Sequence, residues 1–209
     1  MGIRERKERE KERRRQQILV AAKRVFSSKG LDGATIDDIA EEAELSAGTL
    51  YLYFKSKDEL CASLAIRLLQ YFVVRIDHLA KEAQLSAGDK IAALKHALFD
   101  IYEFDPQVFK KLILLNSREP FYNVDSDLTA EIEKLRCVAL EKITSIFKVG
   151  VKKGIYICKQ PDEMAEIIWA MFCGIVLWRE DSLSSDRKSP HLEKIMNRAF
   201  QIFERGALA

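Results

Sequence analysis

The sequence contains few residues that break helices and few that build metal or disulfide sites. It has 4 prolines and 9 glycines in 209 residues, and its β-branched runs are short, which favours an all-helical fold. No C-x-x-C pair occurs and the three histidines are scattered, so we expect no metal site and no cofactor. We expect the four cysteines to be free, buried thiols: Cys61, Cys137, Cys158 and Cys173.

Membrane and export signals are also missing. The longest apolar stretch, residues 164–178, contains Glu166 and is shorter than the roughly 20 residues that a bilayer span needs. The N-terminus is highly charged and no apolar segment follows it, unlike a signal peptide. We therefore expect a soluble, cytoplasmic protein in a reducing compartment.

An excess of one charge sign is absent as well. The formal net charge is +2, and residues 1–60 carry 13 Lys or Arg against 12 Asp or Glu, so bulk charge does not indicate a nucleic-acid partner. Residues 4–15 nevertheless hold eight basic and four acidic residues. This segment is either a solvated, partly frayed tail or an arm that contacts DNA phosphates or the minor groove, with Arg13, Arg14 and Arg15 as its best candidates.

The most informative stretch is residues 35–60, TIDDIAEEAELSAGTLYLYFKSKDEL. Thr35 can cap a first helix, Ser46 a second that runs to about Phe54, and Ser56 with Glu59 can form a capping box for a third. Leu50 and Phe54 are four residues apart and point inward together. Short helices, a tight turn and a polar second helix predict a helix-turn-helix, whose second helix enters the DNA major groove.

These residues carry a family resemblance. TIDDIAEEA followed by SAGTLYLYFKSKDEL resembles the N-terminal signature of the tetracycline-repressor (TetR) family, closely over about residues 17–64. The remaining two thirds is similar to the family only in length and helical pattern. One departure is Glu44, which stands where the family usually has Gly. If the backbone there is left-handed, Glu44 carries about 1 kcal/mol of strain.

The second helix offers the groups for DNA contact. Gly48 allows close backbone approach, Thr49 can bond a base edge or a phosphate, and Ala47 can meet a thymine methyl. The family resemblance implies contacts from Thr35, Ser46, Thr49, Tyr51, Tyr53 and Lys57. Structural roles compete with these: Thr35 and Ser46 are caps in any case, Tyr51 can pack half-buried, and Tyr53 can brace the helix.

The second helix has no Arg, Lys, Asn or Gln between residues 46 and 53. The common bidentate readers of guanine and adenine are therefore absent from it. We expect modest direct readout, with more weight on phosphate contacts, methyl contacts and DNA shape.

The pattern predicts nine helices in an all-α chain. We divide it into an arm (residues 1–15), a helix-turn-helix domain (residues 16–62) and a ligand-binding and dimerisation domain (residues 63–209). Further helices are expected at about residues 57–83, 86–104, 106–119, 126–153, 161–179 and from Pro190 onward. The helix that starts at Lys57 would link the DNA-binding part mechanically to the rest.

The helix at residues 161–179 is apolar nearly all round and must be buried on every side. The family resemblance implies that it forms a homodimer's four-helix bundle with the last helix, although a monomeric core is the alternative. The resemblance also implies a small ligand that shifts the linking helix. Aromatic residues of the middle helices are core or line its apolar cavity: Phe72, Phe99, Tyr102, Phe109, Phe121, Tyr122, Trp169 and Phe172.

No nucleophile, base and acid set occurs, so we do not expect an enzyme. We interpret the chain as a homodimeric transcriptional regulator, a repressor that a small, largely apolar ligand releases from a palindromic DNA operator. The rival hypothesis is an all-helical small-molecule binding or enzymatic protein with a vestigial helix-turn-helix. Repressor and activator are not distinguished by these residues.

Overall fold

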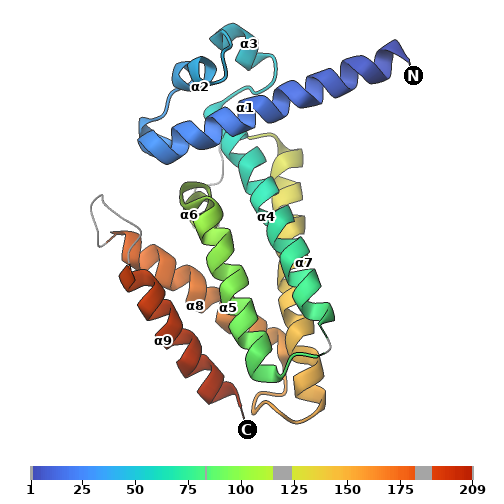
Figure 1. Cartoon of the computed structure of the whole chain (residues 1–209), viewed down its shortest axis with the longest axis vertical. Coiled ribbons are helices and arrows are strands. Elements are labelled where there is room, and N and C mark those ends of the chain that lie inside the picture. Colours follow the sequence, from blue (N-terminus) through green and yellow to red (C-terminus); the bar gives the residue numbers. More distant parts are fainter. Residues whose placement is uncertain (1, 83, 115–123, 182–189, 209) are drawn as a thin grey trace. The chain divides into compact units, whose positions relative to one another are not determined.

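The computed structural model describes residues 2–82, 84–114, 124–181 and 190–208. These residues form an all-helical chain of nine helices without a strand, as predicted (Figure 1). The helices are α1 (Ile3–Gly33), α2 (Ile36–Glu42), α3 (Ala47–Tyr51), α4 (Lys57–Lys81), α5 (Ala87–Phe104), α6 (Pro106–Leu114), α7 (Ser126–Lys152), α8 (Pro161–Asp181) and α9 (Pro190–Ala207). An isolated antiparallel bridge joins Tyr156 to Leu208.

The chain falls into two compact units. Unit 1 comprises Met1–Leu68 and Asp105–Ile132, and unit 2 comprises Leu69–Phe104 and Glu133–Ala209. Unit 1 therefore contains α1, α2, α3 and α6, and α4 and α7 each contribute residues to both units.

Unit 1 is built on α1. The apolar stripe of this helix includes Ile18, Ala22 and Phe26, which have no exposed surface, and α2 and α6 pack against α1. Gly30 takes a left-handed conformation with φ of 73°, so regular helical geometry is interrupted there, as predicted from the Gly after Lys29. Leu50 and Phe54 are fully buried, which confirms their predicted inward orientation.

Unit 2 contains the aromatic core of the second part of the chain. The rings of Phe147 and Tyr156 lie edge to face at 5.7 Å between centroids, and Phe147 also contacts Phe203 of α9. Helix α9 packs against both α5 and α8. Helix α8 buries Ile168 and Phe172, but its Trp178 is 76% exposed. The predicted burial of α8 on every side includes a dimer partner, and a single chain leaves part of α8 exposed.

The cysteines divide into two classes. Cys61 and Cys173 are buried, and burial raises the pKa of both thiols to about 12. Cys158 is half-buried and its thiol donates to the Gln160 carbonyl at 3.4 Å, whereas Cys137 is exposed on α7. The expectation of four buried thiols is wrong for Cys137, because its position on α7 faces solvent.

Membrane spans and metal clusters are both absent from the described residues. None of the helices there combines the length and the apolar character of a membrane span. The same residues contain no group of three or more His, Cys, Asp or Glu side chains arranged to hold a metal ion.

Candidate nucleic-acid interface

The turn between α2 and α3 is closed by backbone hydrogen bonds. The Leu45 N–H donates to the Ala40 carbonyl at 2.8 Å and the Glu44 N–H donates to the Glu41 carbonyl at 3.0 Å, which together form a Schellman motif. Glu44 is left-handed, with φ of 55°, and no other non-glycine residue in the described chain has a positive φ. The left-handed backbone conformation, for which the family usually has Gly, is therefore present here, and this chain adopts it with Glu44.

Both helices of the motif start with a capping residue. The Thr35 hydroxyl accepts from the Asp38 N–H at 3.1 Å, and the Asp38 carboxylate accepts from the Thr35 N–H at 3.0 Å. The Ser46 hydroxyl accepts from the Thr49 N–H at 3.1 Å and shares a hydrogen bond with the Thr49 hydroxyl at 2.9 Å. Thr35 and Ser46 thus fix the two helix starts and keep their hydroxyls at the surface.

Helix α3 is shorter than predicted, since it ends at Tyr51 and not near Phe54. Its outer surface presents Tyr51, which is 53% exposed, and Leu52 just beyond it, which is 80% exposed. Gly48 is also exposed, and a Cβ there would meet only the Ser46 hydroxyl at 3.9 Å. Thr49 and Ala47 are half-buried. Tyr51 is therefore not mainly a packing residue, because more than half of its surface is exposed.

Arg15 belongs to the folded unit, in contrast to the predicted arm. Its guanidinium donates to the Tyr53 carbonyl at 3.1 Å and to the Ser63 hydroxyl at 3.1 Å, and it lies 4.2 Å from the centre of the Phe54 ring. These contacts link α1 to the end of the recognition segment and to α4. Tyr53 itself is half-buried, in keeping with the bracing role. Arg15 is thus a positioning residue.

Arg13 and Arg14 precede the buried part of α1 and lie on different sides of the helix. Arg13 is exposed, and Arg14 is half-buried and donates to the Gln17 side-chain oxygen at 3.0 Å. The predicted frayed tail is absent, because helix α1 begins at Ile3. Both arginines are therefore held on a helix.

Lys57 has a structural use that sequence reasoning missed. Its ammonium donates to the carbonyls of Leu31 at 2.6 Å and Ala34 at 3.1 Å, just after the break at Gly30. The nearby Lys55 has a side chain that is 81% exposed and lies 3.8 Å from Asp125, a surface pair of small energetic value. Lys55 and Leu52 are surface candidates that sequence reasoning missed, although their position directly after the second helix was a usable signal.

Two ion pairs hold α2 against α1. Arg24 pairs with Glu42 at 3.0 Å and Lys29 pairs with Asp38 at 2.7 Å. The hydrogen bond from Lys29, with those from Thr35, lowers the pKa of Asp38 to about 2. The helix-turn-helix is thus braced at both ends of α2.

The predicted ligand-binding aromatics do not form one group. Phe72, Trp169 and Phe172 form a chain in unit 2, with centroids 5.9 Å and 6.4 Å apart. Phe99 and Tyr102 form a separate pair at 6.2 Å. Burial, with the Glu103 charge, raises the pKa of Tyr102. Phe109 is buried in unit 1, and the predicted pair Phe121 and Tyr122 lies outside the described residues.

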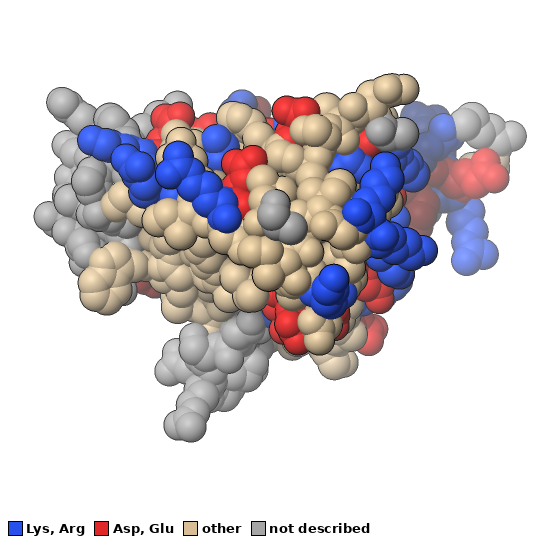
Figure 2. Space-filling view, turned by 90° about the horizontal axis from the view of Figure 1, so that it is seen from below, with Lys and Arg blue, Asp and Glu red and all other residues tan. Residues whose placement is uncertain are grey.

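Surface charge is mixed. Figure 2 shows one face of the molecule, on which Lys and Arg side chains are interspersed with Asp and Glu side chains. This agrees with the net charge of +2.

Comparison with known proteins adds an independent observation. The model of the family described as bacterial regulatory proteins, tetR family, matches residues 18–64. An uncharacterized HTH-type transcriptional regulator of Haemophilus influenzae is 39% identical over 62 residues, which are 30% of this chain and 33% of that protein. The aligned part thus spans about a third of that relative's length.

Solved structures match over most of the chain. PfmR, a TetR family transcriptional regulator from Thermus thermophilus, has a TM-score of 0.70 at 19% identity, covering 90% of this chain and 97% of that chain. The transcriptional regulator FadR from Bacillus subtilis, in complex with stearoyl-CoA, has a TM-score of 0.63 at 22% identity, covering 91% of this chain and 98% of that chain. At these identities the likeness shows the fold. Residues 18–64 thus form a helix-turn-helix domain of the tetR family of bacterial regulatory proteins, and the chain as a whole has the fold of the TetR family regulators to which it is similar.

Proposed function

We propose that this protein is a homodimeric, cytoplasmic transcriptional repressor that binds a palindromic DNA operator and is released from it by a small, largely apolar ligand. The observation that carries the proposal is the surface of α3. Its N-terminus is fixed by Ser46 and its C-terminal end by Arg15, and Tyr51 projects from it more than half exposed. A short helix that is anchored at both ends but open on its outer surface suits insertion into a major groove.

The residues of α3 define what it can read. Thr49 and Tyr51 carry hydroxyls that can bond phosphates or base edges, and Ala47 offers a methyl group. Gly48 leaves the first turn open to close approach of DNA. Without a bidentate side chain on α3, specificity rests more on methyl contacts and DNA shape. We assign Tyr53, Thr35 and Arg14 to supporting phosphate contacts, whereas Arg13 lies on another side of α1 from Arg14.

Arg15 and Lys57 support the interface indirectly. Arg15 positions the backbone after α3, and Lys57 holds the end of α1 through the Leu31 and Ala34 carbonyls. In this proposal they orient the surface that meets DNA. The Lys57 ammonium already donates to these two carbonyls, so a phosphate contact would have to share its remaining hydrogen-bond donor.

The ligand proposal rests on unit 2. Phe72, Trp169 and Phe172 form a continuous aromatic chain there, to which an apolar ligand is chemically suited. The structure of FadR, a fold neighbour, contains stearoyl-CoA. We propose that the ligand acts by shifting α4, which would lower the affinity of the ligand-bound protein for DNA by linkage.

The test is fluorescence anisotropy with the full-length protein. The DNA is the region upstream of its own gene, with a scrambled duplex as control, titrated over a salt series. Tyr51→Ala and Thr49→Ala are expected to weaken binding about tenfold each, because each removes a hydroxyl from a charged phosphate or a base edge. Val74→Ala, at a residue of unit 2 that is 69% exposed, is the matched surface control and is expected to bind like the wild type.

The outcomes separate the hypotheses. Equal, weak binding to both duplexes would send the search for an operator to a random-sequence selection, repeated with the same variants. If neither the upstream region nor any selected sequence is bound at low salt, the repressor proposal fails. The small-molecule binding or enzymatic hypothesis would then replace it.

A further inference from the structure

The N-terminal part of α1 extends beyond the core of unit 1 as a helix. The first residue of the helix with a fully buried side chain is Ile18, and residues 4–13 are exposed. Four charged turns therefore precede the buried part of the same helix. A helix, unlike a flexible tail, assigns each of these charges to a definite side.

The basic residues on one side continue the buried stripe. Ile18, Ala21 and Val25 of the buried part follow a 3–4 spacing, and the same spacing extended toward the N-terminus gives Arg14, Lys11, Lys7 and Arg4. We call these four residues the basic stripe. The stripe therefore lies on the side of α1 that, further along, packs into unit 1.

Three acidic residues occupy the neighbouring side. Glu5, Glu8 and Glu12 have the same 3–4 spacing one position later, in line with Arg15, which contacts Ser63 of α4. Glu5 accepts from the Gly2 N–H at 3.2 Å and Glu12 accepts from the Gln16 amide at 2.5 Å, so two of these acids are bonded along the helix. These three acids are thus separated from the basic stripe around the helix, and the fourth acid of the segment, Glu10, lies on the opposite flank of the stripe, near the line of Gln17.

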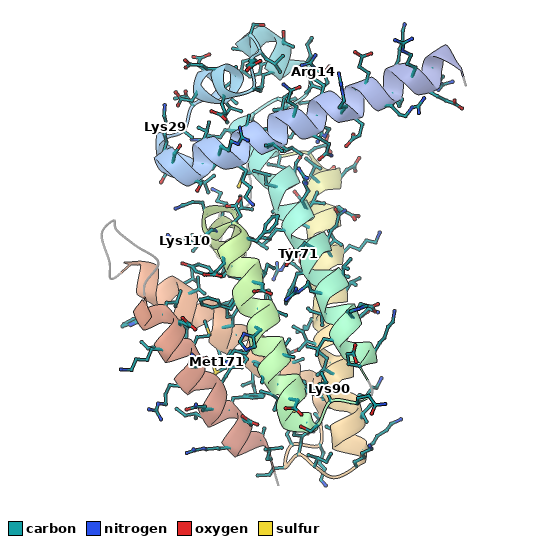
Figure 3. All side chains as sticks on the ribbon, in the orientation of Figure 1. Arg14, Lys29, Tyr71, Lys90, Lys110 and Met171 are labelled. Atoms are coloured by element: carbon teal, nitrogen blue, oxygen red, sulfur yellow. The ribbon has the colours of Figure 1, made fainter. Side chains whose placement is uncertain are left out.

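The contacts of α1 identify the two sides. Gln17 donates to the Ala43 carbonyl at the end of α2, and Arg24 pairs with Glu42 of α2. On a helical wheel the basic stripe lies between these α2-facing positions and the α4-facing Arg15; three of the acids lie beyond Arg15, and Glu10 lies at the α2-facing flank. In Figure 3, Arg14 lies on the side of α1 where α2 and α3 are found.

We propose that the basic stripe, Arg4, Lys7, Lys11 and Arg14, is a second DNA-contacting element, placed by the continuous helix α1 on the same side as α3 and directed at phosphates beside the bases that α3 reads. This inference rests on the proposed function. From Arg4 to Arg14 the stripe extends over eleven residues, a rise of about 15 Å, which matches about four phosphates along one strand.

The chemistry of such a contact is sequence-independent. Lys and Arg side chains that approach phosphates release counterions, so they add affinity and salt dependence without selecting a base sequence. This complements an α3 that lacks bidentate base readers. The Arg6 and Arg9 side chains lie off the stripe, on a line that also contains Arg13 and passes close to Arg24, and Arg9 donates to the Glu5 carbonyl at 3.4 Å.

The test compares two double variants with the same loss of charge. Lys7→Gln with Lys11→Gln removes two members of the stripe, and Arg6→Gln with Arg9→Gln removes two charges that lie off the stripe over the same helical turns. Gln is a good helix former, so circular dichroism is expected to match the wild type for both. The measurement is DNA binding of the full chain by anisotropy over a salt series, from about 50 to about 300 mM, with the selected operator and a scrambled duplex.

We expect the stripe variant to reduce the slope of log K against log salt by about 2, at about 0.9 per phosphate contact, and the control variant to change it by less than about 0.5. The ratio of operator to scrambled affinity is expected to stay unchanged in both. Equal slopes for the two variants would overturn the inference while leaving the regulator proposal intact. A wild type that binds no DNA would overturn the regulator proposal and the inference with it.

Discussion

Glu44 is the residue whose backbone conformation costs most at the candidate interface. It is the C′ residue of the Schellman motif that ends α2, and its φ of 55° places a side chain in a region that glycine adopts freely. The two hydrogen bonds of the motif keep the turn closed despite this cost. The spacing between α2 and α3 is therefore maintained by backbone bonds rather than by the residue type.

Replacing Glu44 with glycine should stabilise unit 1. Relief of the left-handed strain is worth about 1 kcal/mol, partly offset by the greater freedom of glycine in the unfolded chain. We expect Glu44→Gly to raise the free energy of unfolding, measured by urea titration followed by far-UV circular dichroism. Glu44→Ala is the control, since it removes the charge but keeps the Cβ, and we expect no gain from it. Equal stabilisation by both variants would assign the effect to charge and not to φ.

For single residues, the role could be predicted from the sequence where the hydrogen-bond partner lies nearby in the chain. Ser46 as a cap and Gly30 as a helix break were predictable, because their hydrogen-bond partners lie within four residues. The partners of Lys57 and Arg15 were not: Leu31 is 26 positions from Lys57 and Ser63 is 48 positions from Arg15. Residue type suggested DNA contact for both, and only tertiary packing reveals the carbonyl and hydroxyl groups that they bind.

Among the helices, the pairing of α4 with α7 in unit 2 depends on a charged cluster. Asp77 of α4 accepts hydrogen bonds from Lys142 of α7 and from Lys81 one turn further along α4. These bonds, that from Lys142 first, lower the pKa of the Asp77 carboxyl to about 2. The starts of helices α2 to α9 were predicted from caps and prolines, but this cross-helix partner was not, because the sequence of α4 alone does not show which residue of another helix lies beside Asp77.

The low pKa of Asp77 makes its contribution to stability depend on pH. Because the folded-state pKa of about 2 lies below the ordinary value of 3.8, the stabilisation is complete above about pH 5 and is lost as pH falls through about 4 toward 2. We expect Asp77→Asn to lower the melting temperature at about pH 7 and this difference to shrink toward about pH 2. Calorimetry of both proteins at constant ionic strength measures it. A difference that stays constant over this pH range would mean that ionisation of Asp77 plays no part.

For the molecule as a whole, the exposed apolar residues of the last two helices are the main unexplained feature of a single chain. Ile167 and Trp178 of α8 are 55% and 76% exposed, and Ile202 of α9 is 66% exposed. Helix α8 was expected to be buried all round, and one copy of the chain buries only part of it. A second copy on α8 and α9 would cover these side chains, and a dimer would carry two copies of α3, the number that a palindromic site requires.

If α8 and α9 form the dimer interface, substitutions there should change the oligomeric state without changing the residues of α3 that contact DNA. Ile167→Glu with Ile202→Glu places charges on the proposed interface, where burial of an unpaired carboxylate is costly, and we expect a monomer by analytical ultracentrifugation. Because two linked half-sites add their binding energies, we expect the monomer to bind a palindromic operator on the order of 100-fold more weakly while its affinity for one half-site is retained. Val74→Glu, at a residue of α4 that is 69% exposed, introduces the same side chain elsewhere in unit 2 and should remain dimeric. If the α8–α9 variant stays dimeric, the second copy must cover another surface.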